Sequence, residues 1–243
     1  GGTQIACGTA VIDGTVGTAE WADATKLPMK GYYYEEDNGV VVAPARADGP
    51  TGQLQPAQFN DDETEGWLYL KNDERYLYVG ATMDIGEEDP SDWGIYFEVA
   101  FTDEPCGDPA AWVDGKWAAP DCPDSPGEGT FVAEQEGLDP QDGPYFVPGS
   151  EAEYWCGNDT EAAQGVKAKG GLHTAHYEMS IDLANSELDC VGPGDCFRLY
   201  VYLDEWFHAA GDLDSLVIDG WVSWPEFVEY GGDPGWFGTI CLN

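Results

Sequence analysis

The chain has 243 residues, 42% of them hydrophobic, which suffices for one large all-β domain or two small ones. Nine lysines and arginines stand against 47 aspartates and glutamates, so the formal net charge is −38. Such a surface repels phosphate backbones and anionic lipid and attracts cations, which argues against nucleic acid and anionic membranes as partners. A salt-rich medium or a calcium-binding extracellular surface would each explain the acidity.

Alternating apolar and polar residues predict a series of short strands. In the first quarter of the chain we expect strands at residues 4–12, 27–34 and 39–45, with a single helical turn at residues 18–24. No apolar run approaches the roughly 20 residues that would cross a bilayer, so no transmembrane segment is expected. The chain opens on Gly1-Gly2 without a signal segment, and we expect a processed, secreted protein.

A β-hairpin is predicted at residues 66–84, where Asn72 and Asp73 provide turn chemistry between two β-prone runs. Its aliphatic face belongs in a core. The opposite face is aromatic and continues on a later strand. It forms either a platform for a glycan or partner, or packing beneath a long insertion; its tyrosines are Tyr69, Tyr78, Tyr200 and Tyr202.

Further strands are expected at residues 93–101, 176–183, 197–204, 216–224 and 236–242. Residues 103–150 differ, because they hold half of the 16 prolines and show no sustained periodicity. We expect an ordered, Pro/Gly-rich, disulfide-stapled insertion lying on the sandwich. Since no long 3.6-residue pattern is present, the fold class is an all-β antiparallel sandwich, with residues 1–243 as a single domain.

Seven cysteines indicate an oxidising compartment, although sequence alone does not fix their pairing. Three pairs are plausible by position: Cys190 with Cys196 around a Gly-Pro-Gly turn, Cys106 with Cys122 in the Pro-rich region, and Cys7 with Cys241 in the first and last strands. Cys156 is left over, as a buried thiol or an intermolecular bond. Asn158 begins an Asn-Asp-Thr glycosylation acceptor.

Five segments, in this order, resemble family 9 carbohydrate-binding modules and their DOMON-like relatives. They are Ile12-Asp13-Gly14 with Trp21-Ala22-Asp23-Ala24; the hairpin at residues 69–79; residues 92–99; residues 176–183 with Gly192-Pro193-Gly194-Asp195 and residues 197–204; and Ser223-Trp224-Pro225 with residues 235–240.

This resemblance implies a jelly-roll-like sandwich with adjacent N- and C-terminal strands, which supports the Cys7–Cys241 pairing. It also implies extracellular, non-enzymatic work, often glycan binding with a structural calcium ion. Family 9 modules hold a sugar between two tryptophans. The candidate sugar-binding residues here are Trp206, Trp221 and Trp224, with Asp204 and Glu205 as hydroxyl acceptors.

Acidic loops offer the hard oxygen ligands that Ca²⁺ prefers, although none has the spacing of an EF-hand. The candidate metal ligands are Asp61, Asp62, Asp84, Glu87 and Asp89. Some DOMON-like relatives bind haem, for which Met83 and Met179 are candidates, but core packing explains both more simply.

We therefore expect a secreted, non-catalytic module that recognises a glycan through aromatic and acidic residues. The sequence contains no Gly-x-Ser-x-Gly elbow and no phosphate-binding loop, which agrees with a non-enzyme. The alternative is a self-assembling structural subunit of an extracellular surface layer or filament. A haem-binding redox domain is a more distant one.

Overall fold

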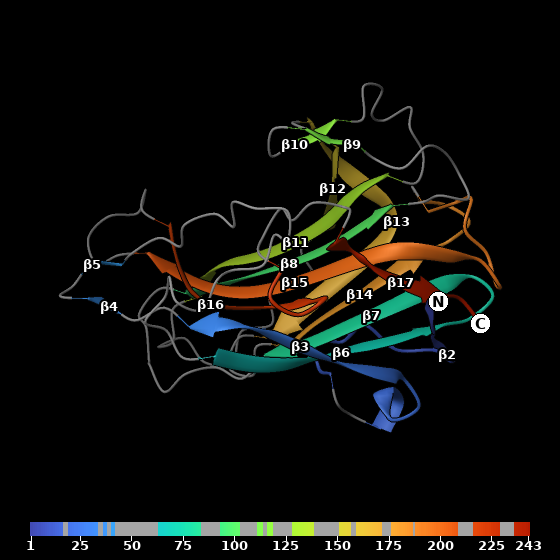
Figure 1. Ribbon diagram of the computed structural model, residues 1–243, viewed down its shortest axis with the longest axis horizontal. Helices are drawn as coiled ribbons and strands as arrows, with labels where there is room; N and C mark the ends of the chain where they lie inside the picture. Colours follow the sequence, from blue (N-terminus) through green and yellow to red (C-terminus); the bar gives the residue numbers. More distant parts are fainter. Residues whose placement is uncertain are drawn as a thin grey trace.

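The computed structural model describes residues 1–16, 19–33, 36–37, 40–41, 63–83, 93–102, 111–113, 116–118, 128–138, 151–156, 159–171, 176–186, 188–208, 216–228 and 236–243 (Figure 1). They are almost entirely β-structure, with one 3-10 turn, η1 (Ala19–Trp21). No helix among them is long and apolar enough to span a membrane. The strands are β1 (Thr3–Gln4), β2 (Ala6–Cys7), β3 (Thr25–Tyr33), β4 (Glu36–Asp37), β5 (Val40–Val41), β6 (Glu63–Asn72), β7 (Tyr76–Met83), β8 (Trp93–Thr102), β9 (Ala111–Val113), β10 (Lys116–Ala118), β11 (Glu128–Leu138), β12 (Glu151–Cys156), β13 (Asp159–Gly171), β14 (His176–Asp182), β15 (Cys196–His208), β16 (Leu216–Trp224) and β17 (Gly238–Cys241).

Ten of the described strands form a ring in which each is hydrogen-bonded to a neighbour on both sides. The order is β8-β15-β16-β3-β6-β7-β14-β13-β12-β11, and β11 pairs with β8 to close it. All ten pairings are antiparallel. The ring is flattened into two layers, with β8, β11, β15 and β16 facing β3, β6, β7 and β14 (Figure 1). The predicted antiparallel β-sandwich is confirmed.

The main core fills the space between the two layers. It forms because the inward positions of each strand are apolar and the side chains of a strand alternate between faces. Phe97 of β8 stacks on Tyr177 of β14 across the core, with 5.0 Å between ring centroids. Fully buried aliphatic members include Leu68, Leu70, Leu77, Val79, Met179, Ile181, Leu199, Val201 and Val222.

The predicted hairpin is β6 and β7, with Asn72 opposite Leu77. Its aliphatic face lies in the main core, as expected, and the haem candidates Met83 and Met179 are buried there. The outer face of the hairpin is covered in part by residues 10–16 and 19–24, because Val16 and Trp21 pack on Tyr78. The tyrosine face of the hairpin therefore packs beneath the N-terminal segment, and not beneath the long insertion as one alternative had it.

The expected insertion at residues 103–150 is wrong in one respect. Its residues 128–138 form β11, a strand of the main ring paired with both β8 and β12. Phe131 of this strand is fully buried and stacks on Phe101. The residues of β12 and β13 were not predicted as strands either, because small and charged residues interrupt their alternation.

The expected first strand at residues 4–12 is two short strands in different layers. β1 runs parallel to β17, and β2 runs parallel to β6. Between them Ile5, 1% exposed, crosses through the main core. The adjacency of the first and last strands is thus confirmed, but the chain has already changed layers when it reaches Cys7.

Because the chain changes layers before Cys7, the predicted Cys7–Cys241 disulfide is wrong. Cys241 is bonded to Cys196, its direct partner across the β15–β17 pair, with a Cα–Cα distance of 4.0 Å. Cys7 is a free, exposed cysteine. Cys190 is disulfide-bonded, but not to Cys196. The Cys106–Cys122 prediction lies outside the described residues, as do the side chain of Cys156 and the acceptor Asn158.

Candidate functional site

The predicted sugar-binding residues lie on β15 and β16, but not on one surface. Asp204 and Trp221 are direct partners across the two strands and share the outer face of the sandwich. Both are buried there, at 4% and 0% exposure. Because the ring of Trp221 has no exposed face, the prediction that it stacks on a sugar is wrong for this conformation. The side chains of Glu205 and Trp206, beside an irregularity in the pairing, lie outside the described ones.

An outer aromatic cluster covers this part of the sheet. Its rings stack in sequence, with Trp221 on Tyr202 and Tyr200 on Phe237, at centroid distances of 5.8 and 5.3 Å. The cluster consists of Tyr32, Tyr96, Ala100, Val132, Tyr200, Tyr202, Trp221, Val228 and Phe237. It is a second core rather than an open platform, closed in part by the segment after β16.

Glu98 lies at the edge of the outer aromatic cluster, at 3% exposure. Its carboxylate accepts hydrogen bonds from Thr130 Oγ1 at 3.1 Å and Tyr96 Oη at 3.4 Å. Burial raises the pKa of Glu98 to about 7, against the opposing effect of these two donors. Neither Glu98 nor Asp204 is accessible to a substrate in this arrangement.

Of the predicted sugar-binding residues whose side chains the structure describes, Trp224 is the one that is partly exposed. It lies on the opposite face of β16 from Trp221, packs against the main core, and lies flat on the backbone of Gly238. A Cβ at Gly238 would come within 2.4 Å of the Trp224 ring. The glycine is therefore required for the close approach of that ring, which fixes the orientation of Trp224.

Residues 223–228, here called the β16 loop, are held by a compact set of hydrogen bonds. Ser223 Oγ donates to the carbonyl of Pro225 and accepts from the amide of Val228, both at 2.8 Å. The amide of Phe227 donates to the carbonyl of Lys30 on β3, at 3.1 Å. These contacts fix the backbone from which Trp224, Glu226 and Phe227 present half-buried side chains.

Phe227 is also strained, with a φ of 61°. A non-glycine residue in the left-handed region costs roughly 1–2 kcal/mol, and such strain is concentrated at functional sites. The ring of Phe227 packs on Tyr32, with 5.3 Å between centroids. Like Trp236, Phe227 is a partly buried member at the border of the outer aromatic cluster.

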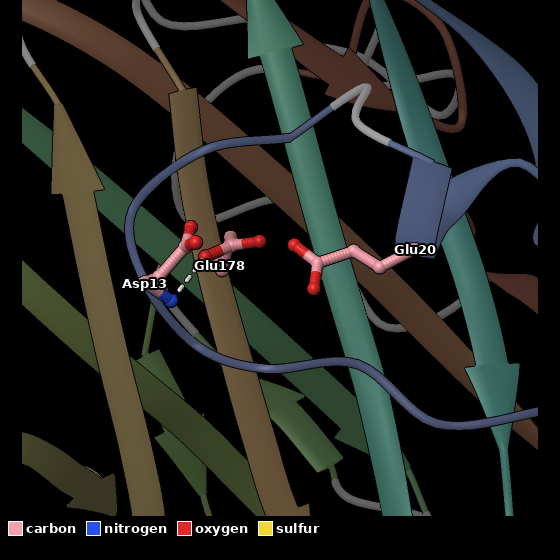
Figure 2. A group of neighbouring side chains, drawn as sticks. All are labelled: Asp13, Glu20 and Glu178. Carbon is pink, nitrogen blue, oxygen red and sulfur yellow. Dashed lines mark hydrogen bonds between the residues drawn. The ribbon is translucent and has the colours of Figure 1, made fainter.

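A cluster of three carboxylates lies on the other outer face of the sandwich (Figure 2). Asp13 and Glu20 come from the N-terminal segment, and Glu178 comes from β14; one oxygen from each lies within 4.8 Å of the others. Glu178 Oε2 accepts the amides of Asp13 at 2.9 Å and Gly14 at 2.6 Å. Its Oε1 accepts Trp21 Nε1 at 2.7 Å. Burial raises the pKa of Glu178 to about 7, although these donors favour the anion.

The fit of this cluster to a metal ion is limited by Glu178. Two lone pairs of Oε2 are already used by backbone amides, and Oε1 keeps only one acceptor position beside Trp21. Ca²⁺ takes six to eight oxygen ligands, often with bidentate carboxylates. We therefore interpret Glu178 as an anchor for the N-terminal segment. The predicted metal ligands Asp61, Asp62, Asp84, Glu87 and Asp89 all lie outside the described residues.

Sequence reasoning missed Glu226 and Phe227 in the β16 loop and the anchoring role of Glu178. Trp224-Pro225 was a usable signal, since the residue before a proline is pushed out of the helical region and marks a turn. Nothing in the sequence indicated the anchoring role of Glu178, because it is one of many acidic residues at outward-facing positions of the predicted strands.

No protein-family model matches the chain, and no curated protein matches it. Among the solved structures that are similar to the chain are two of carbohydrate-binding proteins. One is a family 9 carbohydrate-binding module from Caldicellulosiruptor kristjanssonii in complex with cellotriose, at 14% identity and a TM-score of 0.45, covering 100% of this chain and 94% of that one. The other is a putative carbohydrate-binding protein from Bacteroides uniformis, at 12% identity and a TM-score of 0.40, covering 100% and 97%.

Proposed function

We propose that the chain is a secreted, non-catalytic β-sandwich module that binds a glycan at the β16 loop. The observation that carries the proposal is the loop itself. It presents two half-buried rings, Trp224 on the main-core side of β16 and Phe227 at the border of the outer aromatic cluster, with Glu226 between them in sequence. Sugars have apolar C–H faces and polar rims, so aromatic rings beside a carboxylate suit them. A locked and strained backbone supports the same function, because it reduces the ordering cost of binding.

The proposal includes no catalytic role. Among the acids that the structure describes beside the outer aromatic cluster, Glu98 and Asp204 are buried, at 3% and 4% exposure. Self-association as a surface-layer or filament subunit remains a prediction from the sequence.

Binding of the intact chain to a broad array of neutral and acidic oligosaccharides tests the proposal. We expect binding, and a loss of roughly tenfold in affinity for Trp224→Ala by calorimetry. Because Trp224→Ala also removes packing on Gly238, Glu226→Gln provides a second variant, which replaces the carboxylate by a neutral amide of similar shape and leaves that packing in place. Val11→Ala, at an apolar residue 65% exposed on the N-terminal segment, is the matched control. A folded chain that binds nothing on the array would overturn the proposal.

A further inference from the structure

The large apolar side chains that are exposed in the described part of the chain lie on one outer face of the sandwich. Trp67 of β6 is 40% exposed, and Val11, 65% exposed, belongs to the N-terminal segment that covers the same layer. β6 lies beside β3 (Figure 1), where Pro28 is exposed, and Tyr69 of β6 is half-buried. Tryptophan is enriched at the centres of protein interfaces, so an exposed one marks a candidate contact with another protein.

The charge around Trp67 differs from that of the whole chain. Nine cations stand against 47 acids in the sequence, so a surface of average composition repels a second copy. Here Lys26 and Lys30 offset the exposed Glu63 and Glu65. None of these four charges belongs to an ion pair among the described residues. A second copy therefore meets no net repulsion at this place.

The register of β3 and β6 makes this surface complementary to itself. Each outward residue of β3 is opposite a residue of a different and matching kind on β6: Lys26 opposite Tyr69, Pro28 opposite Trp67, and Lys30 opposite Glu65. A two-fold axis parallel to the strands and midway between them brings β3 of one copy above β6 of the other and keeps the rows aligned. Every cross-strand pair then recurs between the copies, as a cation on a ring, a proline on a tryptophan and a lysine on a glutamate.

The side chains already show that such contacts fit these strands. Within one copy, the ammonium of Lys26 lies 4.0 Å from the centroid of the Trp67 ring and 5.3 Å from that of the Tyr69 ring. A cation–π contact is weak where it is exposed to water and becomes stronger when it is desolvated. Covering the same rings and lysine with a second copy therefore strengthens an interaction that the single chain has.

We infer that the chain forms a two-fold dimer through this surface, the β3–β6 strip (Lys26, Pro28, Lys30, Glu65, Trp67 and Tyr69). The partner is a second copy of the chain, packed face to face at the spacing of about 10 Å that stacked sheets have. Because both copies use the same surface, the contact closes at two copies, which distinguishes it from a filament. The dimer goes beyond glycan binding at the β16 loop and does not depend on it.

Salt should strengthen the dimer, because attraction and repulsion differ in range. The charge pairs of the strip act at contact, whereas the repulsion between two chains of formal charge −38 acts over the Debye length. That length falls from about 10 Å at 0.1 M salt to about 3 Å at 1 M. We expect a dissociation constant on the order of 100 μM at the lower salt concentration and a several-fold lower one at the higher.

Sedimentation equilibrium of the intact chain, from micromolar to millimolar concentrations at both salt concentrations, tests the inference. Cys7 is alkylated beforehand so that it cannot link two copies. Trp67→Ala should raise the dissociation constant by roughly tenfold or more, because a central tryptophan commonly dominates an interface. Lys30→Glu and Glu65→Lys should each raise it by roughly tenfold, since each places like charges opposite one another at two symmetric positions. The double variant Lys30→Glu/Glu65→Lys should restore most of the affinity.

Glu74→Ala, at the exposed hairpin turn away from the strip, is the control and should leave the dissociation constant unchanged. The midpoint of urea unfolding verifies that each variant is folded. A dimer that tolerates Trp67→Ala and both charge reversals overturns the inference, as does a double variant that binds no better than the single ones. A chain that stays monomeric at both salt concentrations also overturns it, and loss of binding to the oligosaccharide array in Trp67→Ala would then assign the strip to the glycan.

Discussion

Replacing Glu178 by alanine should loosen the N-terminal segment and lower the free energy of unfolding. The carboxylate satisfies the amide of Gly14 and the indole N–H of Trp21, two donors that are otherwise buried. An unsatisfied buried donor costs about 1–3 kcal/mol, so the two together cost about 4 kcal/mol. Removing a buried carboxylate recovers about 3 kcal/mol of this, since burial raises its pKa from 4.5 to about 7. We expect a net loss of about 1 kcal/mol at pH 7.

Urea unfolding gives this difference directly from the midpoint and slope, and hydrogen exchange at Gly14 reports whether the segment opens locally. Glu178→Gln should lose less, because its amide oxygen can still accept either the backbone amides or Trp21. Glu74→Ala, at an exposed hairpin-turn residue, is the control and should stay within about 0.5 kcal/mol of the parent. A Glu178→Ala variant as stable as that control, with unchanged exchange at Gly14, would refute the reasoning.

Three further predictions follow from contacts elsewhere in the sandwich. Burial raises the pKa of Glu98 from 4.5 to about 7, so the contribution of its protonated form to stability is full below pH 4.5 and is lost as the pH rises through 7. Glu98→Gln should therefore be more stable than the parent at pH 8, by on the order of 3 kcal/mol, and of similar stability at pH 5. Urea unfolding at the two pH values measures this difference. Gly31→Ala should destabilise the chain by more than about 3 kcal/mol or prevent folding, because its Cβ would lie 1.8 Å from the carbonyl oxygen of Trp221; thermal unfolding measures this, and a near-native melting temperature would contradict the close β3–β16 approach. The Cys196–Cys241 bond closes a loop of 45 residues, so replacing both cysteines by serine should lower the free energy of unfolding, measured in urea, by about 4 kcal/mol. Alkylation of the exposed Cys7 in the native protein, located by peptide mass spectrometry, should leave the free energy of unfolding unchanged.

The parts of the fold that sequence predicted are those where one strand face is apolar and the other is not. The hairpin is the best example, since Leu77 and Val79 alternate with Tyr76 and Tyr78 over a full strand. β11 was missed because apolar and polar residues alternate over only a few of its positions. Phe131 and Ala133 lie in the core, but glycine and acidic residues flank them in sequence. Its place in the ring depends on its two neighbouring strands, which local pattern does not encode.

The disulfide prediction failed for a different reason, because it depends on which strands meet. The adjacency of the first and last strands was correct, but a shift of three residues separates Gln4, opposite Cys241, from Cys7 in the other layer. Likewise, Trp221 and Trp224 are three residues apart on one strand and so face opposite sides of the sheet, one buried and one half-buried. Aromatic composition predicts that rings are available, and the register of the strands decides which of them are exposed.

The closure of the ring has a consequence for how the chain reaches its native state. The seam between β8 and β15 joins residues 93–102 to residues 198–207, and β3 obtains its second partner only from β16. Contacts this distant in sequence are typical of domains that fold in milliseconds to seconds. During synthesis, the edges of β8 and β3 stay unpaired until the last fifth of the chain has emerged. Repulsion among the many carboxylates would then keep such partly formed sheets from pairing with one another.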